Sequence, residues 1–328
     1  MVSLSRTGLV ALALLGPIAP AAAATTPPAQ SCHNPDALGT ARTIAVGGAV
    51  ELGLKTYPRT LDLQDHEVVL TFDDGPWGPT TPAVLDALKA QCVRASFFLI
   101  GRNAETHAAL VQREVAEGHS VGHHTFDHPA LTLRNMEDGA AVRDIVHGME
   151  VDDKAAGYGP WTGEPRVPFF RFPGFGYSEA TRAYLKAHGI TAFGADLWAS
   201  DWIPMTPEAE FDRLMGRVRA AGRGIILLHD IKRQTADMLP RFLAALKAEG
   251  FHVVHVVPGP AAPPTRAAPA GWTSETEETL AHLWPKGRPL AQAAPRIRPK
   301  PEEAPVKASA RPDDAGVGDD PPPLRPGQ

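Results

Sequence analysis

The sequence of 328 residues is poor in cysteine, with only Cys32 and Cys92. Two thiols exclude a disulfide scaffold and a zinc cluster built from cysteines. Two possibilities stay open for them: a single disulfide bridge in an oxidising compartment, or two unpaired thiols with Cys92 buried.

The sequence also lacks an excess of positive charge, because 37 acidic residues stand against 32 basic ones and the net charge is −5. A nucleic-acid-binding protein usually carries a basic patch or stripe, so we expect no nucleic-acid partner. The glycine-rich phosphate motifs G-x-G-x-x-G and G-x-x-x-x-G-K-[ST] are absent. The H-E-x-x-H motif of zinc peptidases is absent as well, which argues against that class.

The apolar run at the start of the chain is too short and too rich in proline to span a membrane, which takes about 20 residues. Residues 1–24 carry one charge, at Arg6, and Pro17 and Pro20 interrupt an apolar segment that ends in four alanines. This pattern is typical of a signal peptide that is cleaved during export. We therefore expect an exported protein, periplasmic or secreted, with no stable membrane span.

Both ends of the chain lack the pattern of a folded domain. Residues 259–328 contain 15 of the 33 prolines, with nine acidic and nine basic residues, and only 275–283 suggests a helix. We expect a disordered or extended tail there. Residues 25–65 form an N-terminal extension in which 43–54 alternates weakly, as in a strand or hairpin. One large domain then remains at residues 66–258.

Short apolar runs rich in β-formers alternate with helical patterns through this domain. The strands are predicted at 67–72, 95–100, 119–124, 167–171, 190–195, 224–229 and 252–257. The helices are predicted at 82–90, 104–117, 137–154, 178–187, 207–220 and 235–249. This alternation predicts an α/β fold with a parallel sheet covered by helices. Seven strands favour a barrel or barrel-like sheet over a six-stranded dinucleotide fold.

Polar residues follow the predicted strands one after another, at the end of a parallel barrel where function collects. Asp73 and Asp74 come at the end of the first strand, so one can bind a cation while the other handles protons. His124 and His128 follow the third strand, four residues apart, so both imidazoles can face one point. With Asp74 they make a set of two histidines and one carboxylate that suits zinc or another transition metal.

Three more strand ends carry polar side chains. Arg171 precedes a Pro/Gly turn and offers a fixed cation with exposed backbone N–H groups. The acids and tryptophans between Asp196 and Trp202 resemble a sugar-contacting wall. His229 stands at the tip of an apolar strand, which suggests a positioned acid or base.

These motifs resemble, in the same order, those of the polysaccharide deacetylases, carbohydrate esterase family 4, including the nodulation-type chitooligosaccharide deacetylases. They are Thr71–Gly75 (TFDDG), His124–His128 (HTFDH), Arg171–Pro173 (RFP), Asp201–Trp202 (DW) and Leu227–His229 (LLH). The resemblance spans about residues 66–257. It implies a catalytic domain at 66–258 with a distorted barrel of about seven or eight β/α units.

The resemblance also implies a role for each matching residue and a divalent metal cofactor, zinc or else cobalt or another transition metal. Asp74, His124 and His128 would hold the metal; Asp73 would be the general base, oriented by Arg171; His229 would protonate the leaving amine, oriented by Asp201; Trp202 and Leu227 would line the acetyl pocket. The implied substrate is a poly- or oligosaccharide containing N-acetylglucosamine, such as peptidoglycan or chitin.

Two alternatives accompany this prediction: an O-acetyl esterase acting on a xylan-like polysaccharide, and a non-catalytic carbohydrate-binding relative. The presence of both Asp73 and His229 argues against the second, because a binding module needs neither a base nor an acid. The third motif is one residue longer than the usual R-x-P-Y-G and lacks its tyrosine, so either Gly174 or Phe175 would supply the oxyanion N–H. His123 stands where the family usually has Asn, which leaves open a shift of the ligand by one residue.

Overall fold

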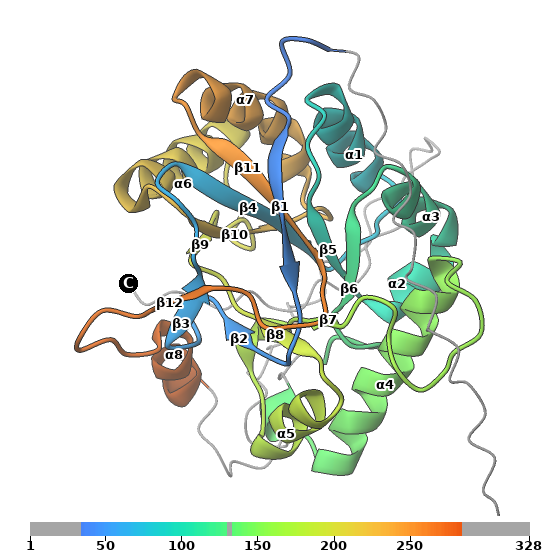
Figure 1. Cartoon of the computed structure of the whole chain (residues 1–328). Helices are drawn as coiled ribbons and strands as arrows, with labels where there is room; N and C mark the ends of the chain where they lie inside the picture. The colour runs from blue at the N-terminus through green and yellow to red at the C-terminus, as the bar shows by residue number, and fades with distance from the viewer. Residues whose placement is uncertain (1–33, 130–132, 284–328) are drawn as a thin grey trace, which may run out of the picture.

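The computed structural model describes residues 34–129 and 133–283 (Figure 1). The predicted signal peptide, Cys32 and the end of the predicted tail therefore lie outside the described residues. Cys92 is disulfide-bonded, which excludes the prediction of a free thiol at this position. Within the described ranges, no helix has the length and apolar character needed to cross a membrane.

The chain alternates strands and helices as the sequence predicts. The strands are β1 (Thr40–Val46), β2 (Glu51–Leu52), β3 (Arg59–Leu61), β4 (Glu67–Asp73), β5 (Ser96–Leu99), β6 (Ser120–His123), β7 (Phe169–Phe170), β8 (Thr191–Phe193), β9 (Leu197–Trp198), β10 (Gly224–His229), β11 (His252–Pro258) and β12 (Thr265–Ala267). The helices are α1 (Thr81–Ala90), α2 (Gly101–Thr106), α3 (Ala108–Ala116), α4 (Asp138–Ala155), α5 (Glu179–Ala187), α6 (Pro207–Ala221), α7 (Arg233–Ala248) and α8 (Glu275–Leu283), with short 3-10 turns η1 (Leu133–Asn135) and η2 (Pro173–Phe175).

The main sheet is parallel throughout its described pairings and has the order β1-β11-β4-β5-β6-β7-β8-β2. Strand β4 also pairs with β10, which carries β9 on its other side. Figure 1 shows the helices arranged around the outside of this sheet. The predicted α/β class and barrel-like parallel sheet are therefore confirmed, and all seven predicted strands are present.

The domain extends beyond the boundaries predicted at residues 66 and 258. Strand β1 lies in the predicted N-terminal extension and pairs with β11, and β2 pairs with β8. In the predicted tail, β12 pairs antiparallel with β3 and α8 buries Leu280. The sequence indicates α8 and part of β1, but it hides β2, β3 and β12, because strands of two or three residues show no readable period and because prolines surround β12.

The alternation of side chains along β4 sets the two cores and directs the site residues. Every residue of this strand is buried. Val68, Leu70 and Phe72 belong to the cluster packed under α1 and α7, whereas Val69 belongs to a second cluster inside the barrel. Because successive side chains of a strand point to opposite faces, Asp73 faces the interior like Val69.

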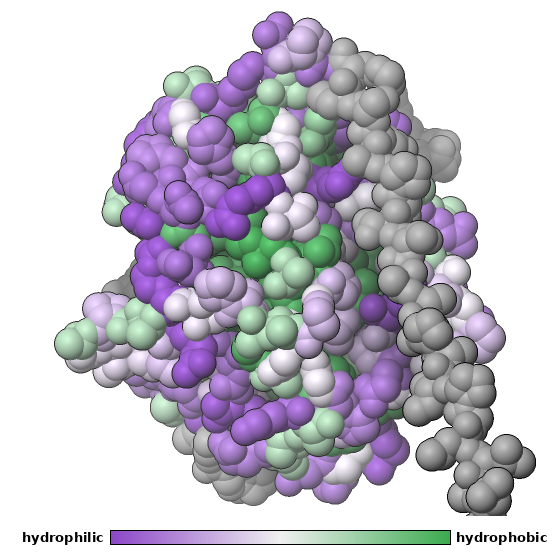
Figure 2. Space-filling model, viewed as in Figure 1, coloured by the Kyte–Doolittle hydropathy of each residue, from purple (hydrophilic) through white to green (hydrophobic). Residues whose placement is uncertain are grey.

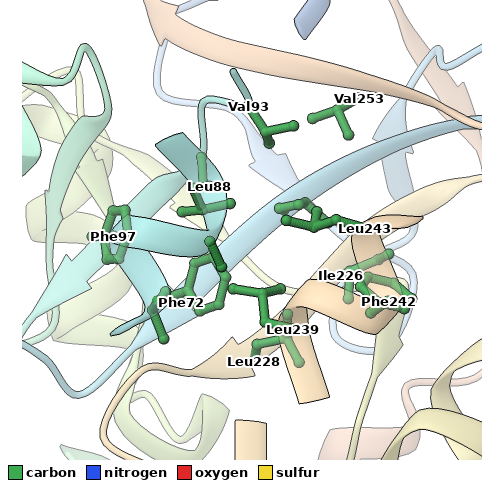
Figure 3. Close-up of a cluster of buried hydrophobic side chains, with 14 of the residues drawn as sticks. Phe72, Leu88, Val93, Phe97, Ile226, Leu228, Leu239, Phe242, Leu243 and Val253 are labelled. Atoms are coloured by element: carbon green, nitrogen blue, oxygen red, sulfur yellow. The ribbon is translucent and has the colours of Figure 1, made fainter. Parts of the chain in front are cut away.

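Both clusters are strongly apolar. Figure 3 shows the outer one, which includes Phe72, Leu88, Phe97, Ile226, Leu239 and Phe242. The inner one includes Val69, Phe98, Phe169, Phe193, Ile225 and Val256. On the face viewed in Figure 1, hydrophobic residues gather in the middle and hydrophilic residues surround them (Figure 2). The barrel interior is thus packed with apolar side chains, and the polar residues are left at the ends of the strands.

Candidate active site

Asp74, His124 and His128 converge on one point at the carboxyl ends of β4 and β6. Oδ1 of Asp74 lies 3.5 Å from Nε2 of His124 and 3.4 Å from Nε2 of His128. One ligand atom from each residue falls within 4.8 Å of the others, and within the described ranges this is the one group of three with that property. The structure therefore brings together the three residues predicted as metal ligands.

The chemistry of this group fits a divalent cation. Nδ1 of His124 donates to the carbonyl of Arg171 at 2.7 Å, which leaves the lone pair of Nε2 directed at Asp74. Oδ1 of Asp74 is buried without a hydrogen-bond partner. Burial raises the pKa of Asp74, but the charges of His128, His229 and His124 outweigh it and lower the pKa to about 2. A buried, ionised carboxylate with an unpaired oxygen is suited to bind a cation.

The two loops that carry these ligands are held by close packing. Asp74 and His128 have left-handed backbone with φ of 75° and 48°. Asn103 of α2 donates to the carbonyl of Asp74 at 2.8 Å, which fixes the first loop. A Cβ at Gly148 of α4 would overlap the backbone of Thr125, so α4 approaches the histidine loop more closely than any other residue would allow.

His123 lies on the other side of β6 and outside this group. Its Nδ1 is 2.9 Å from Oδ2 of Asp152 on α4, and both side chains are fully buried. Neighbouring residues of a strand point to opposite faces, so His124 and His123 cannot both reach Asp74. The geometry gives no support to a ligand set shifted by one residue.

Asp73 lies beside the metal-ligand group but is bound to Arg171. Its Oδ1 accepts a hydrogen bond from Nη1 of Arg171 at 2.6 Å, and Oδ2 lies 3.9 Å from Nε2 of His124. Arg171 is fully buried, and its guanidinium also donates to Thr71 Oγ1 at 2.9 Å and to the carbonyl of Gly194 at 2.9 Å. Burial raises the pKa of Asp73 to about 6, against the opposing charges of Arg171 and His229. Asp73 therefore has one oxygen fixed and one directed at the site.

His229 approaches the group from β10 and is held by Asp201. Nδ1 of His229 lies 2.9 Å from Oδ1 of Asp201, and Nε2 lies 3.9 Å from Oδ2 of Asp74. Burial alone would lower the pKa of His229, but the carboxylates of Asp201, Asp74 and Asp73 raise it to about 9. The imidazole is thus kept protonated and turned towards the site.

Two residues behind Asp201 were missed by the sequence analysis. Oγ1 of Thr235 lies 3.0 Å from Oδ2 of Asp201 and 2.9 Å from Oε1 of Glu210. Burial raises the pKa of Glu210 to about 8, so its carboxyl group is protonated below that pH. Thr235 can then accept from Glu210 and donate to Asp201. The available signal was a glutamate on the otherwise apolar buried face of α6.

The apolar residues predicted near the acetyl group also come together. Phe175 and Leu227 form a small buried cluster, against which Trp198 and Trp202 pack. The ring centroids of Trp202 and His229 are 6.1 Å apart. These side chains form an apolar wall next to His229.

The turn η2 distinguishes the two candidate N–H donors. Phe175 donates its backbone N–H to the carbonyl of Phe172 at 2.8 Å. Gly174 has a φ of 54°, and its N–H has no acceptor in the part of the chain that the structure describes. Of the two, Gly174 is the donor that stays available to a ligand.

The predicted role of Asp196 in a sugar-contacting wall is wrong. Its Oδ1 accepts from the N–H of Leu54 at 2.7 Å. Its Oδ2 accepts from the N–H of Ile225 at 2.8 Å and from Thr60 Oγ1 at 2.7 Å. Asp196 therefore joins three separate segments of the barrel and faces none of the site.

Parallel strands that end in two acids, a histidine pair and a lone histidine define an α/β barrel with a hydrolase-like site.

Comparison with known proteins identifies the family. The family model described as polysaccharide deacetylase matches residues 61–193. A peptidoglycan-N-acetylglucosamine deacetylase of Bacillus cereus is 32% identical over 197 residues, which cover 58% of this chain and 85% of that protein. PgdA of Listeria monocytogenes, also named a peptidoglycan-N-acetylglucosamine deacetylase, is 31% identical over 192 residues, which cover 58% of this chain and 38% of that protein. The chain belongs to the polysaccharide deacetylase family.

A solved structure supports the same conclusion. The Bdellovibrio bacteriovorus peptidoglycan deacetylase Bd3279 has a TM-score of 0.55 and 29% identity, with 66% of this chain and 61% of that chain covered. This chain spans less than half the length of the Listeria relative. The motifs at Asp201–Trp202 and Leu227–His229 lie beyond the residues that the family model matches.

Proposed function

We propose that this protein is a metal-dependent hydrolase that removes N-acetyl groups from a polysaccharide containing N-acetylglucosamine. One observation carries the proposal. The convergent group of Asp74, His124 and His128 lies between an arginine-bound carboxylate, Asp73, and an aspartate-bound histidine, His229. A metal site flanked by a base and a separate acid is what amide hydrolysis requires.

Asp74, His124 and His128 would hold the cation, zinc or cobalt being suited to two imidazoles and one carboxylate. When bound, such an ion polarises the acetyl carbonyl and lowers the pKa of a coordinated water towards about 7. The pKa of Nε2 in His124 is lowered by burial first, and then by His128, to about 3, so this imidazole is neutral and fit to be a ligand.

The attacking water gives its proton to Oδ2 of Asp73. Oδ1 of the same carboxylate is held by Arg171 at 2.6 Å, so the free oxygen is the one that faces the metal-ligand group. The buried guanidinium fixes the orientation of the base. As the new C–O bond forms, the N–H of Gly174 is available to donate to the oxygen that becomes negatively charged.

The C–N bond breaks when the nitrogen receives a proton from Nε2 of His229. Asp201 holds Nδ1 of this ring at 2.9 Å, which keeps Nε2 directed at the site. The products are acetate and the free amine of the sugar. Trp202 and Leu227 would enclose the acetyl methyl group, because they form the apolar wall beside His229.

Peptidoglycan is the substrate that the relatives favour, since those from Bacillus cereus and Listeria monocytogenes are named peptidoglycan-N-acetylglucosamine deacetylases. The signal-peptide pattern of residues 1–24 supports a location in the periplasm or outside the cell. Either location would give the enzyme access to peptidoglycan.

The test is acetate release from a panel of peptidoglycan, chitooligosaccharide and acetylated xylan. We expect release from the N-acetylated substrates and little from the xylan ester. Release from xylan alone would replace this proposal with that of an O-acetyl esterase, and no release from any substrate would support a non-catalytic relative.

A further inference from the structure

We infer that the C-terminal segment Thr265–Leu283, here called the strap, positions Trp198 as part of the glycan-binding wall next to the catalytic centre. The inference rests on the proposed function and extends it to residues that lie outside the match to the family model, which ends at residue 193. The strap comprises β12, the turn after it and α8, and Figure 1 shows it beside β3.

The strap is bound to the loop between β2 and β3. Nε1 of Trp272 donates to the carbonyl of Leu54 at 2.7 Å. The backbone N–H and the hydroxyl of Thr276 donate to the carbonyl of Lys55 at 3.0 Å and 3.2 Å. The ammonium of Lys55 forms an ion pair with Glu275, the first residue of α8. Two consecutive residues of the loop are thus held by the strap through both backbone and side chain.

The same two loop residues hold the segment that leads to the site. The N–H of Lys55 donates to the carbonyl of Ala195 at 2.8 Å, and the N–H of Leu54 donates to Asp196 at 2.7 Å. The ammonium of Lys55 also lies over the ring of Trp198, 4.7 Å from its centroid. A cation over an aromatic face is attracted by the negative charge density of the ring. Glu275 therefore acts on Trp198 through Lys55.

A continuous row of rings connects Trp198 with the catalytic histidine. The centroid of Trp198 lies 5.5 Å from that of Trp202, which lies 6.1 Å from that of His229. On its other side, Trp198 is 6.0 Å from Phe175, the residue that follows the available N–H of Gly174. Trp198 is only partly buried. It therefore extends the apolar wall outwards, where the sugars that adjoin the reacting residue would lie.

A second ion pair holds the strap on the other side. Glu277 of α8 accepts from Nη1 of Arg134 at 2.8 Å, and the side chain of Arg134 is almost fully buried. Arg134 belongs to η1, which follows the metal-binding histidines in the chain. The strap is thus tied to both the β2–β3 loop and η1, and these ties hold this part of the predicted tail against the domain.

The inference predicts a selective defect in glycan binding. Trp198→Phe keeps an aromatic ring, Trp198→Ala removes the wall, and Glu275→Gln releases Lys55 from its partner without changing the site. For a chitotetraose substrate we expect KM to rise about twofold to fivefold in Glu275→Gln, with kcat nearly unchanged, and KM to rise more in Trp198→Ala. For a small acetylated substrate that reaches only the catalytic pocket, kcat and KM of Glu275→Gln should stay at the wild-type values.

Two variants serve as controls. Lys55→Arg retains the ion pair and the cation over the ring, so it should keep the wild-type KM. Glu249→Gln breaks an ion pair with Arg219, where the two contacts measure 2.8 Å and 2.6 Å and join α6 to the end of α7 on the surface. It should change neither constant. Binding of chitotetraose by calorimetry, in an inactive Asp73→Asn background, measures the same effect without turnover.

The outcomes separate the inference from the proposed function. Equal chitotetraose affinity in Trp198→Ala, Glu275→Gln and the parent protein, with wild-type protein active on this substrate, would overturn the inference and leave the proposed function intact. A parallel loss of kcat on the small substrate would also overturn it, because the strap would then support the whole fold. Wild-type protein that releases no acetate from any N-acetylated glycan would overturn both.

Discussion

Both carboxylate oxygens of Asp201 hold His229. Oδ1 lies 2.9 Å from Nδ1 of the imidazole, and Oδ2 accepts from the backbone N–H of the same residue at 2.6 Å. One side chain therefore fixes the ring, its tautomer and the end of β10 together. The arrangement keeps a proton on Nδ1 and leaves Nε2 directed at the site.

Asp201→Asn should weaken this control while preserving the shape of the residue. The amide carries no charge, so it no longer holds the pKa of His229 high, and the imidazole is protonated over a narrower range of pH. We expect kcat for amide cleavage to fall about 10–100-fold, and the alkaline limb of the pH–rate profile to move to lower pH. A rate profile with the wild-type alkaline limb would contradict this role for Asp201.

Asp73→Asn should retain the metal and lose catalysis by about 10²–10⁴-fold on both an N-acetyl substrate and an ester analogue. Asp73 contacts Arg171 rather than the convergent group of ligands, so its removal leaves Asp74, His124 and His128 in place. Metal content by elemental analysis and acetate release measure the two effects separately.

His229→Ala should impair amide cleavage more than ester cleavage, because an alkoxide leaves with less help from a proton than an amine does. Equal losses on the two substrates, or loss of the metal from Asp73→Asn, would show that base and acid are not divided between these residues as we propose.

His124→Ala should lose stoichiometric zinc, whereas His123→Ala should keep most of it. Nε2 of His124 lies 3.5 Å from Asp74, but His123 is bound to Asp152 behind the strand. His123→Ala should instead destabilise the fold by about 1–3 kcal/mol, because it leaves the buried carboxyl of Asp152 without its partner. Zinc titration and urea unfolding of both variants decide the point, and the opposite pattern would move the ligand to His123.

Glu114→Gln should stabilise the protein at alkaline pH. The side chain is fully buried, neither carboxylate oxygen has a hydrogen-bond partner, and burial raises its pKa well above 4.5. Because the pKa of Glu114 is higher in the folded than in the unfolded protein, its contribution to the free energy of unfolding is fully present below about pH 4.5. This contribution is lost as the pH rises towards the folded pKa.

The wild-type free energy of unfolding should therefore fall with pH by up to about 1.4 kcal/mol per unit more than that of Glu114→Gln. Urea unfolding between pH 5 and pH 9 measures the difference, with the exposed Glu105→Gln as a control. If the free energy of unfolding of Glu114→Gln and of the wild type changed with pH in the same way, Glu114 would not be protonated in the folded protein, and this prediction would be wrong.

The sequence identifies those parts of the site that stand at the ends of long strands. The continuous apolar run of β4 predicts a buried strand, and Asp73 and Asp74 follow directly from it. By contrast, β9 has two residues, too few to show a period, and its pairing with β10 depends on tertiary contacts. The position of Asp196 inside the fold has the same origin, since its three donors come from segments that only the folded chain brings together.

The coupling of Thr235 and Glu210 to Asp201 also escapes the sequence, because these residues lie on different helices and approach each other only across the packed surface of α6 and α7. Proline content misled the prediction for residues 259–283 in a different way. It correctly indicates extended backbone, but extended backbone that finds a strand partner, as β12 finds β3, becomes part of the domain.

The central claim is that a metal held by Asp74, His124 and His128 is required to hydrolyse an N-acetyl group. Its most direct test is the rate of acetate release from chitotetraose by the native protein, by protein freed of metal with a chelator, and by the same protein after addition of zinc or cobalt. We expect the metal-free protein to lose almost all activity and one equivalent of either ion to restore it. Full acetate release by protein shown to be free of metal would contradict the account.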